Sequence, residues 1–251
     1  MNPVCPDPAA LRLRAAGRSC AATALAGAAL LGVLALAAPT AMAEEPAQPF
    51  SLAEKHLFMT DHLKNLPAKG SVISYRFIKT GSFEAPYEDK VTEEVGTPDP
   101  AGDNGRTVKL EFLSGSHKLE LPPIENAKGN PVIMGFLERD VREMNRITGG
   151  GGSQGVYYKK RLRMAMVDTK EAHPATLKWN GKDVVGEEFT LDPYKDDPAR
   201  VRYARFANKT YTFVVSDQVP GGVYSIRTVM RDPEVKGKIM IEETLTLTET
   251  K

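Results

Sequence analysis

Short segments in which apolar and polar residues alternate dominate this 251-residue sequence. In the first of them, Ile73, Tyr75 and Phe77 alternate with Ser74 and Arg76. A period of two is typical of a β-strand with one buried face. Strands are predicted in the same way near residues 91–95, 108–112, 117–121, 157–166, 184–191, 211–215, 223–230 and 239–247. With the turns between them, these segments indicate about nine or ten strands, mostly paired with their neighbours in sequence.

The turns between these segments carry their own signals. Trp179-Asn180-Gly181-Lys182 is the strongest, because the two central positions of a type I′ hairpin turn need a positive φ, which Asn and Gly accept. Ser114-Gly115-Ser116 predicts a turn, and Pro220-Gly221-Gly222 separates two of the last strands. These short turns support an antiparallel sheet rather than strands joined by long crossovers.

Two segments have helical periodicity instead. Ser51-Leu52-Ala53-Glu54 has the form of a capping box and predicts a helix from Leu52 to Asn65, with polar residues including His56 and His62 on the domain surface. Asn130-Pro131 predicts the start of a second helix. Its apolar residues recur at intervals of three and four, and its charged residues are expected on the opposite side. The apolar set is Ile133, Leu137, Val141, Met144 and Ile147, and the charged set is Glu138, Arg139, Asp140, Arg142, Glu143 and Arg146.

The predicted fold is mainly β (α+β). A sheet of nine or ten strands must curl because strand twist accumulates across it. We expect a curved antiparallel meander or an incomplete β-barrel with the two amphipathic helices packed against it; a two-sheet sandwich with helices is the alternative. Charges on both strand parities, including Lys160 and Glu243, disfavour an outer-membrane barrel.

The N-terminus predicts export. Three arginines precede an apolar run, 21–38, which ends in Ala41-Met42-Ala43, a small-x-small cleavage pattern. We expect a cleaved signal peptide over 1–43 and one mature domain over 44–251, with an uncleaved anchor as the alternative. Cleavage removes Cys5 and Cys20, the two cysteines of the chain. A domain of this size without disulfides favours the periplasm over extracellular release.

Charge balance limits the possible partners. The full chain carries a formal charge of +1, and the mature domain would carry −1 because three arginines and one aspartate leave with the signal. Such a balance lacks the basic stripe that binding to DNA or RNA requires, so no nucleic-acid partner is expected. No integral membrane segment is expected after signal cleavage.

The sequence offers no catalytic or metal-binding pattern, and no cofactor is expected. His56 and His62 are six residues apart, which on a helix turns them to different faces, and no cysteine is available in the mature domain to complete a soft metal site. Ser114 and Ser116 lie beside His117 without the glycine-flanked elbow of a serine nucleophile. The run of glycines at 149–152 follows the second helix and is interpreted as a connector to a strand, not a phosphate loop.

Two groups of residues are candidates for binding. Aromatic and methionine side chains that face inward are candidate pocket residues, because flexible thioethers suit an adaptable apolar cavity; they are Tyr75, Phe77, Phe112, Phe136, Met144, Met164, Trp179 and Phe213. The densest basic segment supplies candidate surface residues for an anionic headgroup or an acidic partner: Lys159, Lys160, Arg161 and Arg163. Lys160 shares the apolar parity of its predicted strand and would need a partner or a polar cavity.

These observations support three hypotheses. The first is a non-enzymatic periplasmic carrier for a lipid or other hydrophobic small molecule, similar in architecture alone to open barrels that handle lipids in bacterial envelopes. The second is an envelope interaction or assembly factor with a solid core that binds another envelope protein. The third is a hydrolase without a recognisable motif, with His117 as its best candidate residue.

Overall fold

The computed structural model describes residues 50–251, so the predicted signal segment 1–43 lies outside the described residues. The described part is built on a nine-stranded antiparallel sheet in the order β4-β3-β2-β1-β9-β8-β7-β6-β5. The strands are β1 (Ser71–Thr80), β2 (Tyr87–Asp99), β3 (Gly105–Phe112), β4 (Ile124–Ala127), β5 (His173–Trp179), β6 (Lys182–Leu191), β7 (Lys209–Val215), β8 (Val223–Arg231) and β9 (Ile239–Thr250). Strands β1 to β4 form one antiparallel meander, and strands β5 to β9 form another. Pairing of β1 with β9 joins the two meanders into one sheet.

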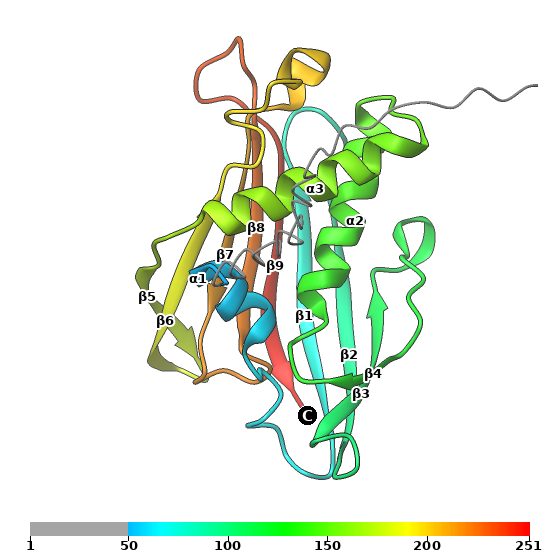
Figure 1. Ribbon diagram of the computed structural model, residues 1–251, viewed down its shortest axis with the longest axis vertical. Coiled ribbons are helices and arrows are strands. Elements are labelled where there is room, and N and C mark those ends of the chain that lie inside the picture. Colours follow the sequence, from blue (N-terminus) through cyan, green and yellow to red (C-terminus); the bar gives the residue numbers. More distant parts are fainter. Residues whose placement is uncertain (1–49) are drawn as a thin grey trace, which may run out of the picture. The chain divides into compact units, whose positions relative to one another are not determined.

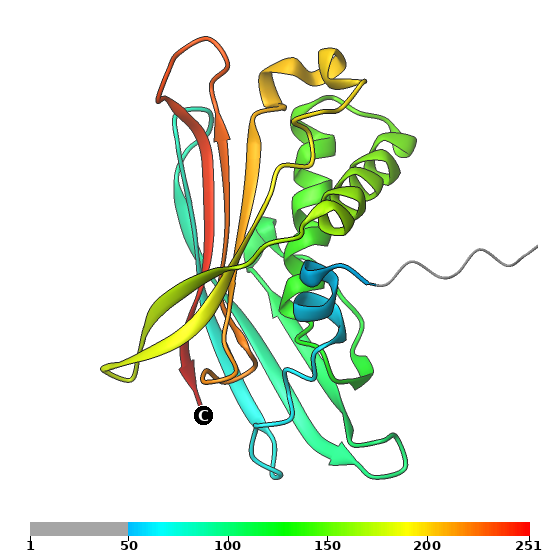
Figure 2. The ribbon, with the colours of Figure 1, turned by 60° about the vertical axis from the view of Figure 1, so that its left-hand side comes forward.

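The helices lie on one face of this twisted, open sheet, and the other face is left uncovered (Figures 1 and 2). The helical segments are α1 (Leu52–Glu54), the π-helix η1 (Lys55–Met59), the 3₁₀ turns η2 (Gly115–His117) and η3 (Arg200–Phe206), and the two long helices α2 (Val132–Ile147) and α3 (Gly152–Asp168). The predicted fold class, a mainly β open antiparallel sheet with helices against it, is confirmed. Within the described residues, no helix is both long and apolar enough to span a membrane.

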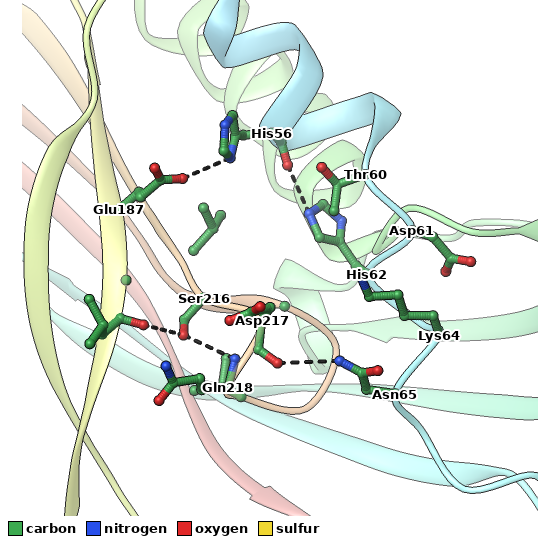
Figure 3. A pocket seen from close by; sticks show the side chains of 15 residues that line it. His56, Thr60, Asp61, His62, Lys64, Asn65, Glu187, Ser216, Asp217 and Gln218 are labelled. Carbon is green, nitrogen blue, oxygen red and sulfur yellow. Dashed lines mark hydrogen bonds and ion pairs between the residues drawn. The ribbon is translucent and has the colours of Figure 1, made fainter.

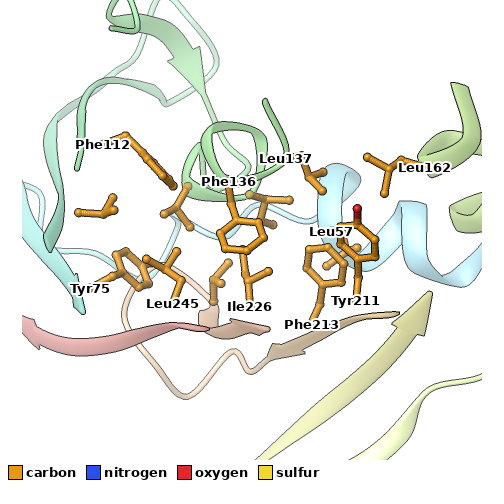
Figure 4. Close-up of a cluster of buried hydrophobic side chains, with 14 of the residues drawn as sticks. Leu57, Tyr75, Phe112, Phe136, Leu137, Leu162, Tyr211, Phe213, Ile226 and Leu245 are labelled. Atoms are coloured by element: carbon orange, nitrogen blue, oxygen red, sulfur yellow. The ribbon is translucent and has the colours of Figure 1, made fainter. Parts of the chain in front are cut away.

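The apolar residues that alternate along the strands point toward α2 and form the core between this helix and the sheet. Ile73, Tyr75 and Phe77 of β1 are fully buried. Figure 4 shows Phe136 of α2 lying above Ile226 and beside Phe213 of the sheet. The buried residues form one continuous cluster from β4 to β6 across the sheet, so the strand periodicity identified the core face correctly.

Buried ion pairs attach α2 to the sheet. Arg139 contacts Glu243 of β9 with a nitrogen–oxygen distance of 2.6 Å, and Glu143 contacts Lys79 of β1 at 2.7 Å. The expectation that all the charged residues of this helix lie opposite its apolar side is therefore wrong for Arg139 and Glu143, and also for Asp140, which is fully buried. They face the sheet because it presents charges of opposite sign on its inward parity.

The first predicted helix is shorter than expected. It ends at Met59, because Thr60 is extended and its hydroxyl donates to the Lys55 carbonyl at 3.0 Å. The Leu63 N–H then donates to Lys128 O at 3.1 Å instead of continuing a helix. His62, which we expected at the surface, is buried in this non-helical segment.

The predicted basic strand at 157–166 is wrong, because these residues lie in α3. Tyr158, Leu162 and Met166 are buried, and a spacing of four fits both a strand and a helix. The intervening Lys160 and Met164 distinguish the two, since a strand would bury them and the helix exposes them. Lys160 therefore needs no buried partner.

The turns that flank α3 and β5 were predicted with different success. Asn180 and Gly181 have φ values of 49° and 75° between paired Trp179 and Lys182, as a type I′ hairpin requires. The glycines at 149–152 do end α2, but they lead into α3 and not into a strand.

The segment after β3 also differs from the prediction. In place of a strand at 117–121 there is the turn η2 and a single bridge between Phe112 and Leu119. The edge strand β4 then follows Pro122-Pro123 and was not predicted.

Candidate ligand-binding site

A capped helical start holds the N-terminal segment against α3. The Ser51 hydroxyl accepts the Glu54 N–H at 3.1 Å, and Glu54 Oε2 accepts the Ser51 N–H at 2.9 Å. This is the capping box that the sequence predicts. The Ser51 hydroxyl also donates to Met166 O at 2.8 Å. The N-terminal helical segment is thereby fixed beside α2 and α3.

A groove of about 300 Å³ lies where these three helical segments meet. Its floor is apolar, with Leu137 and Val141 from α2 and Leu162 and Met166 from α3, all nearly buried. Figure 4 shows Leu137 and Leu162 close together at the boundary between the two helices. The remaining lining residues are Glu54, Phe58, Met134, Glu138, Lys159 and Arg163. We call this set of ten residues the apolar groove.

One wall of the apolar groove is an exposed methionine. Met134 of α2 keeps 56% of its side chain exposed, although it lies on a helix with extensive buried surface. A long apolar side chain at the edge of an apolar hollow adapts readily to a hydrophobic ligand. The groove therefore offers apolar surface that the folded chain leaves uncovered.

Charged residues form the rim of the apolar groove. Lys159 Nζ lies 2.7 Å from Glu138 Oε2, which links α3 to α2. Arg142 contacts the other oxygen of Glu138 at 3.0 Å. The hydrogen bond from Lys159, together with Arg142, lowers the pKa of Glu138. Arg163 makes no hydrogen bond or ion pair with any of residues 50–251 through its side chain.

A second hollow, of about 400 Å³, is lined mainly by polar residues and lies between the N-terminal segment, β6 and the loop that follows β7. We call it the polar hollow. Figure 3 shows His56 and Glu187 facing one another, with His56 Nδ1 2.8 Å from Glu187 Oε2. His62 lies behind them. Its Nδ1 accepts the Asn130 N–H at 3.1 Å, so its Nε2 carries the proton and donates to His56 O at 2.8 Å. Burial lowers the pKa of His62, which favours this neutral form.

The serine of the polar hollow is engaged in backbone hydrogen bonds. The Ser216 hydroxyl donates to Val185 O at 2.5 Å and accepts the Gln218 N–H at 3.1 Å, so its proton does not point to a base. No cluster of three or more His, Cys, Asp or Glu side chains suited to a metal occurs among the described residues. His56 and His62 instead hold the N-terminal segment against β6 and the start of α2.

The predicted pocket residues lie mostly in the packed core. Tyr75, Phe77, Phe112, Phe136, Met144 and Phe213 are fully buried between the sheet and the helices. Met164 is 42% exposed on α3, and Trp179 is half-buried at the end of β5. These eight residues line neither the apolar groove nor the polar hollow, and their contact with a ligand stays a prediction.

The predicted basic residues divide between two sides of α3. Lys159 and Arg163 line the apolar groove. Arg161 turns away and donates to Pro193 O at 2.9 Å, with Asp197 at 3.5 Å. Lys160 is exposed. The strand prediction placed Lys159, Arg161 and Arg163 on one face, whereas the helix separates Arg161 from the other two.

Sequence reasoning missed most of the apolar groove. Glu54 and Phe58 are neighbours on the N-terminal helical segment, and only tertiary packing brings them to Met134 of α2. The predicted second helix already contained the part of the floor that α2 supplies. A helical interpretation of α3 would have added Leu162 and Met166 on the same face as Lys159.

The fold and the apolar groove define an open antiparallel sheet with helices on one face and an uncovered apolar hollow among those helices. No protein-family model and no curated protein matches the sequence. Among solved structures, lipoprotein LppX of Mycobacterium tuberculosis aligns with a TM-score of 0.29 and 8% identity, over 70% of this chain and 84% of that one. A LolA superfamily protein from Nitrosomonas europaea aligns with a TM-score of 0.21 and 11% identity, over 79% of this chain and 92% of that one. These scores are too low to carry an argument about function.

Proposed function

We propose that this protein binds and carries a hydrophobic or amphipathic small molecule without changing it chemically. The apolar groove is the observation that supports the proposal. It combines a nearly buried apolar floor with an exposed methionine and a charged rim. Concave sites with apolar walls and a few placed polar groups are the usual form of small-molecule sites.

The proposed carrier acts outside the cytoplasm. This part of the proposal rests on the signal-like order of residues 1–43, with the periplasm as the compartment and extracellular release as the alternative. Periplasmic isolation of a chain starting at Glu44 would support it, whereas a cytoplasmic chain that retains residues 1–43 would contradict it.

The binding test uses N-phenyl-1-naphthylamine, a neutral apolar dye whose fluorescence rises in a hydrophobic site. Met134→Glu places a charge at the edge of the apolar groove and should weaken dye binding about tenfold, because a charge is costly to desolvate beside an apolar ligand. Met59→Glu is the matched control, since Met59 is equally exposed, at 58% against 56%, and does not line the groove. Equal dye affinity of the two variants, or no dye binding by the parent protein, would contradict the proposal.

A further inference from the structure

The charged residues of the apolar groove differ in whether they have a partner. The groove lining contains two cations, Lys159 and Arg163, and two carboxylates, Glu138 and Glu54. Glu138 is shared by Lys159 and Arg142. Glu54 is held by the capping box, where its carboxylate accepts the Ser51 N–H at 2.9 Å. Both carboxylates are therefore engaged by other groups, and Arg163 is the charged residue of the rim that has no hydrogen-bond or ion-pair partner among the described residues.

Helical geometry places Arg163 beside the groove floor. Lys159 and Arg163 are four residues apart on α3, so they lie on the same face, and Leu162 and Met166 of the groove floor lie on that side as well. A guanidinium group binds a carboxylate or phosphate through two parallel hydrogen bonds. A ligand whose chain lies on the floor would have its polar end within reach of this pair.

The volume restricts the apolar part of the ligand. About 300 Å³ is at the lower end of the range for small-molecule sites, roughly 300–1,000 Å³. Such a space suits one alkyl chain better than the two chains of a membrane phospholipid.

From the charge and the volume we infer that the apolar groove selects a single-chain amphiphile with an anionic headgroup, held by Arg163 with Lys159 beside it. This inference rests on the proposed function and names its ligand class. According to this inference, the charged residues of the rim recognise the headgroup. A site that recognised only the apolar chain would bind amphiphiles of either charge.

The test is displacement of N-phenyl-1-naphthylamine by two competitors with the same chain length, dodecanoate and dodecyltrimethylammonium, both below micelle-forming concentrations. Dodecanoate should displace the dye at about tenfold lower concentration. Arg163→Glu should abolish or reverse that preference, with each competitor compared in the same variant so that any change in dye affinity cancels. Arg163→Gln should give an intermediate preference.

The matched control is Lys236→Glu in the loop between β8 and β9, which makes the same change in net charge on an exposed side chain outside the groove. It should keep the dodecanoate preference. Equal displacement by both competitors, stronger displacement by the cation, or loss of preference in Lys236→Glu as well would overturn the inference. If the dye still binds in those cases, the proposed function stands; if neither dye nor amphiphile binds, both fail. Thermal unfolding of each variant confirms that it is folded.

Discussion

Lys209 of β7 and Asp140 of α2 form an ion pair in which both side chains are almost completely buried. The second oxygen of Asp140 accepts the Tyr211 hydroxyl at 2.7 Å. With Arg139–Glu243 and Glu143–Lys79, it is one of three ion pairs that attach one helix to three different strands. Because buried ionic groups tolerate little displacement, these pairs fix the position and rotation of α2 on the sheet.

Removing one member of the buried pair should be more damaging than removing both. Lys209→Met leaves the Asp140 carboxylate without its counter-ion and should lower the free energy of unfolding by about 3–5 kcal/mol. The double variant Asp140→Leu with Lys209→Met should lose less than Lys209→Met alone, because no unpaired buried charge remains. Urea unfolding measures both. Lys118→Met is the control, because it breaks the exposed Lys118–Glu120 pair and should change stability by less than about 1 kcal/mol. A double variant that loses as much stability as Lys209→Met alone, or more, would contradict this account.

Glu93 should make stability depend on pH. It faces the core from β2, its carboxylate oxygens have no hydrogen-bond partner among residues 50–251, and burial raises its pKa from 4.5 to about 8. Between these two values the folded chain keeps the proton and the unfolded chain releases it, so the free energy of unfolding should fall as pH rises from about 5 to about 8.

Glu93→Gln removes this contribution. The variant should show a flatter stability profile and should exceed the parent protein in stability at pH 8.5, by no more than about 5 kcal/mol. Urea titrations at pH 5, 7 and 8.5 measure the difference. Glu94→Gln is the matched control, because Glu94 is the exposed neighbour on the opposite face of the strand. Identical profiles for Glu93→Gln and the parent would show that Glu93 is ionised in the folded state.

Alanine variants of two glycines should distinguish the cost of backbone strain from the cost of a steric clash. Gly222 and Gly181 have similar positive φ values, 71° and 75°. A Cβ at Gly222 would lie 2.6 Å from the His62 ring, whereas a Cβ at Gly181 meets nothing within 4 Å. Both alanine variants bear the left-handed backbone cost of about 1–2 kcal/mol. Gly222→Ala should lose more stability than Gly181→Ala, because it also displaces His62 from Asn130. Equal melting temperatures would show that His62 moves aside without cost.

Arg106 should control the segment between the N-terminal helix and β1. Its buried guanidinium donates to Leu66 O at 2.8 Å and to Pro67 O and Gly96 O at 3.0 Å. Arg106→Met keeps the apolar stem but removes these three hydrogen bonds, although Pro67 O still accepts the Gly70 N–H at 3.1 Å. The substitution should cost about 2 kcal/mol or more, since each unsatisfied group costs roughly 1–3 kcal/mol. Proteolysis should also become faster near Lys64 and Lys69. If stability falls but cleavage near Lys64 and Lys69 is unchanged, Arg106 stabilises a different part of the chain.

The sequence was sufficient for features that depend on local chemistry. Strand alternation identified the inward residues of β1, and Asn180-Gly181 predicted its hairpin turn. The Ser51 capping box was also correct, because all its atoms lie within one helical turn.

Features that depend on tertiary partners were not predictable in this way. The charged residues of α2 looked solvent-exposed because their partners, Lys79, Lys209 and Glu243, are distant in sequence. The helix α3 looked like a strand because its buried residues are spaced by four. The apolar groove was missed for a similar reason, since three separate helical segments supply its lining.

The position of β9 has a consequence for how the sheet forms. It is the last strand in the sequence and the central strand of the nine, with four strands on either side. Strands β1 to β4 and β5 to β8 can each pair through local hairpins, but the β1–β9 register joins Ile73 to Thr250 across almost the whole described chain. Such long-range pairing slows folding. During synthesis the two four-stranded halves must therefore wait, with exposed edges, until residues 239–250 emerge and close the seam between them.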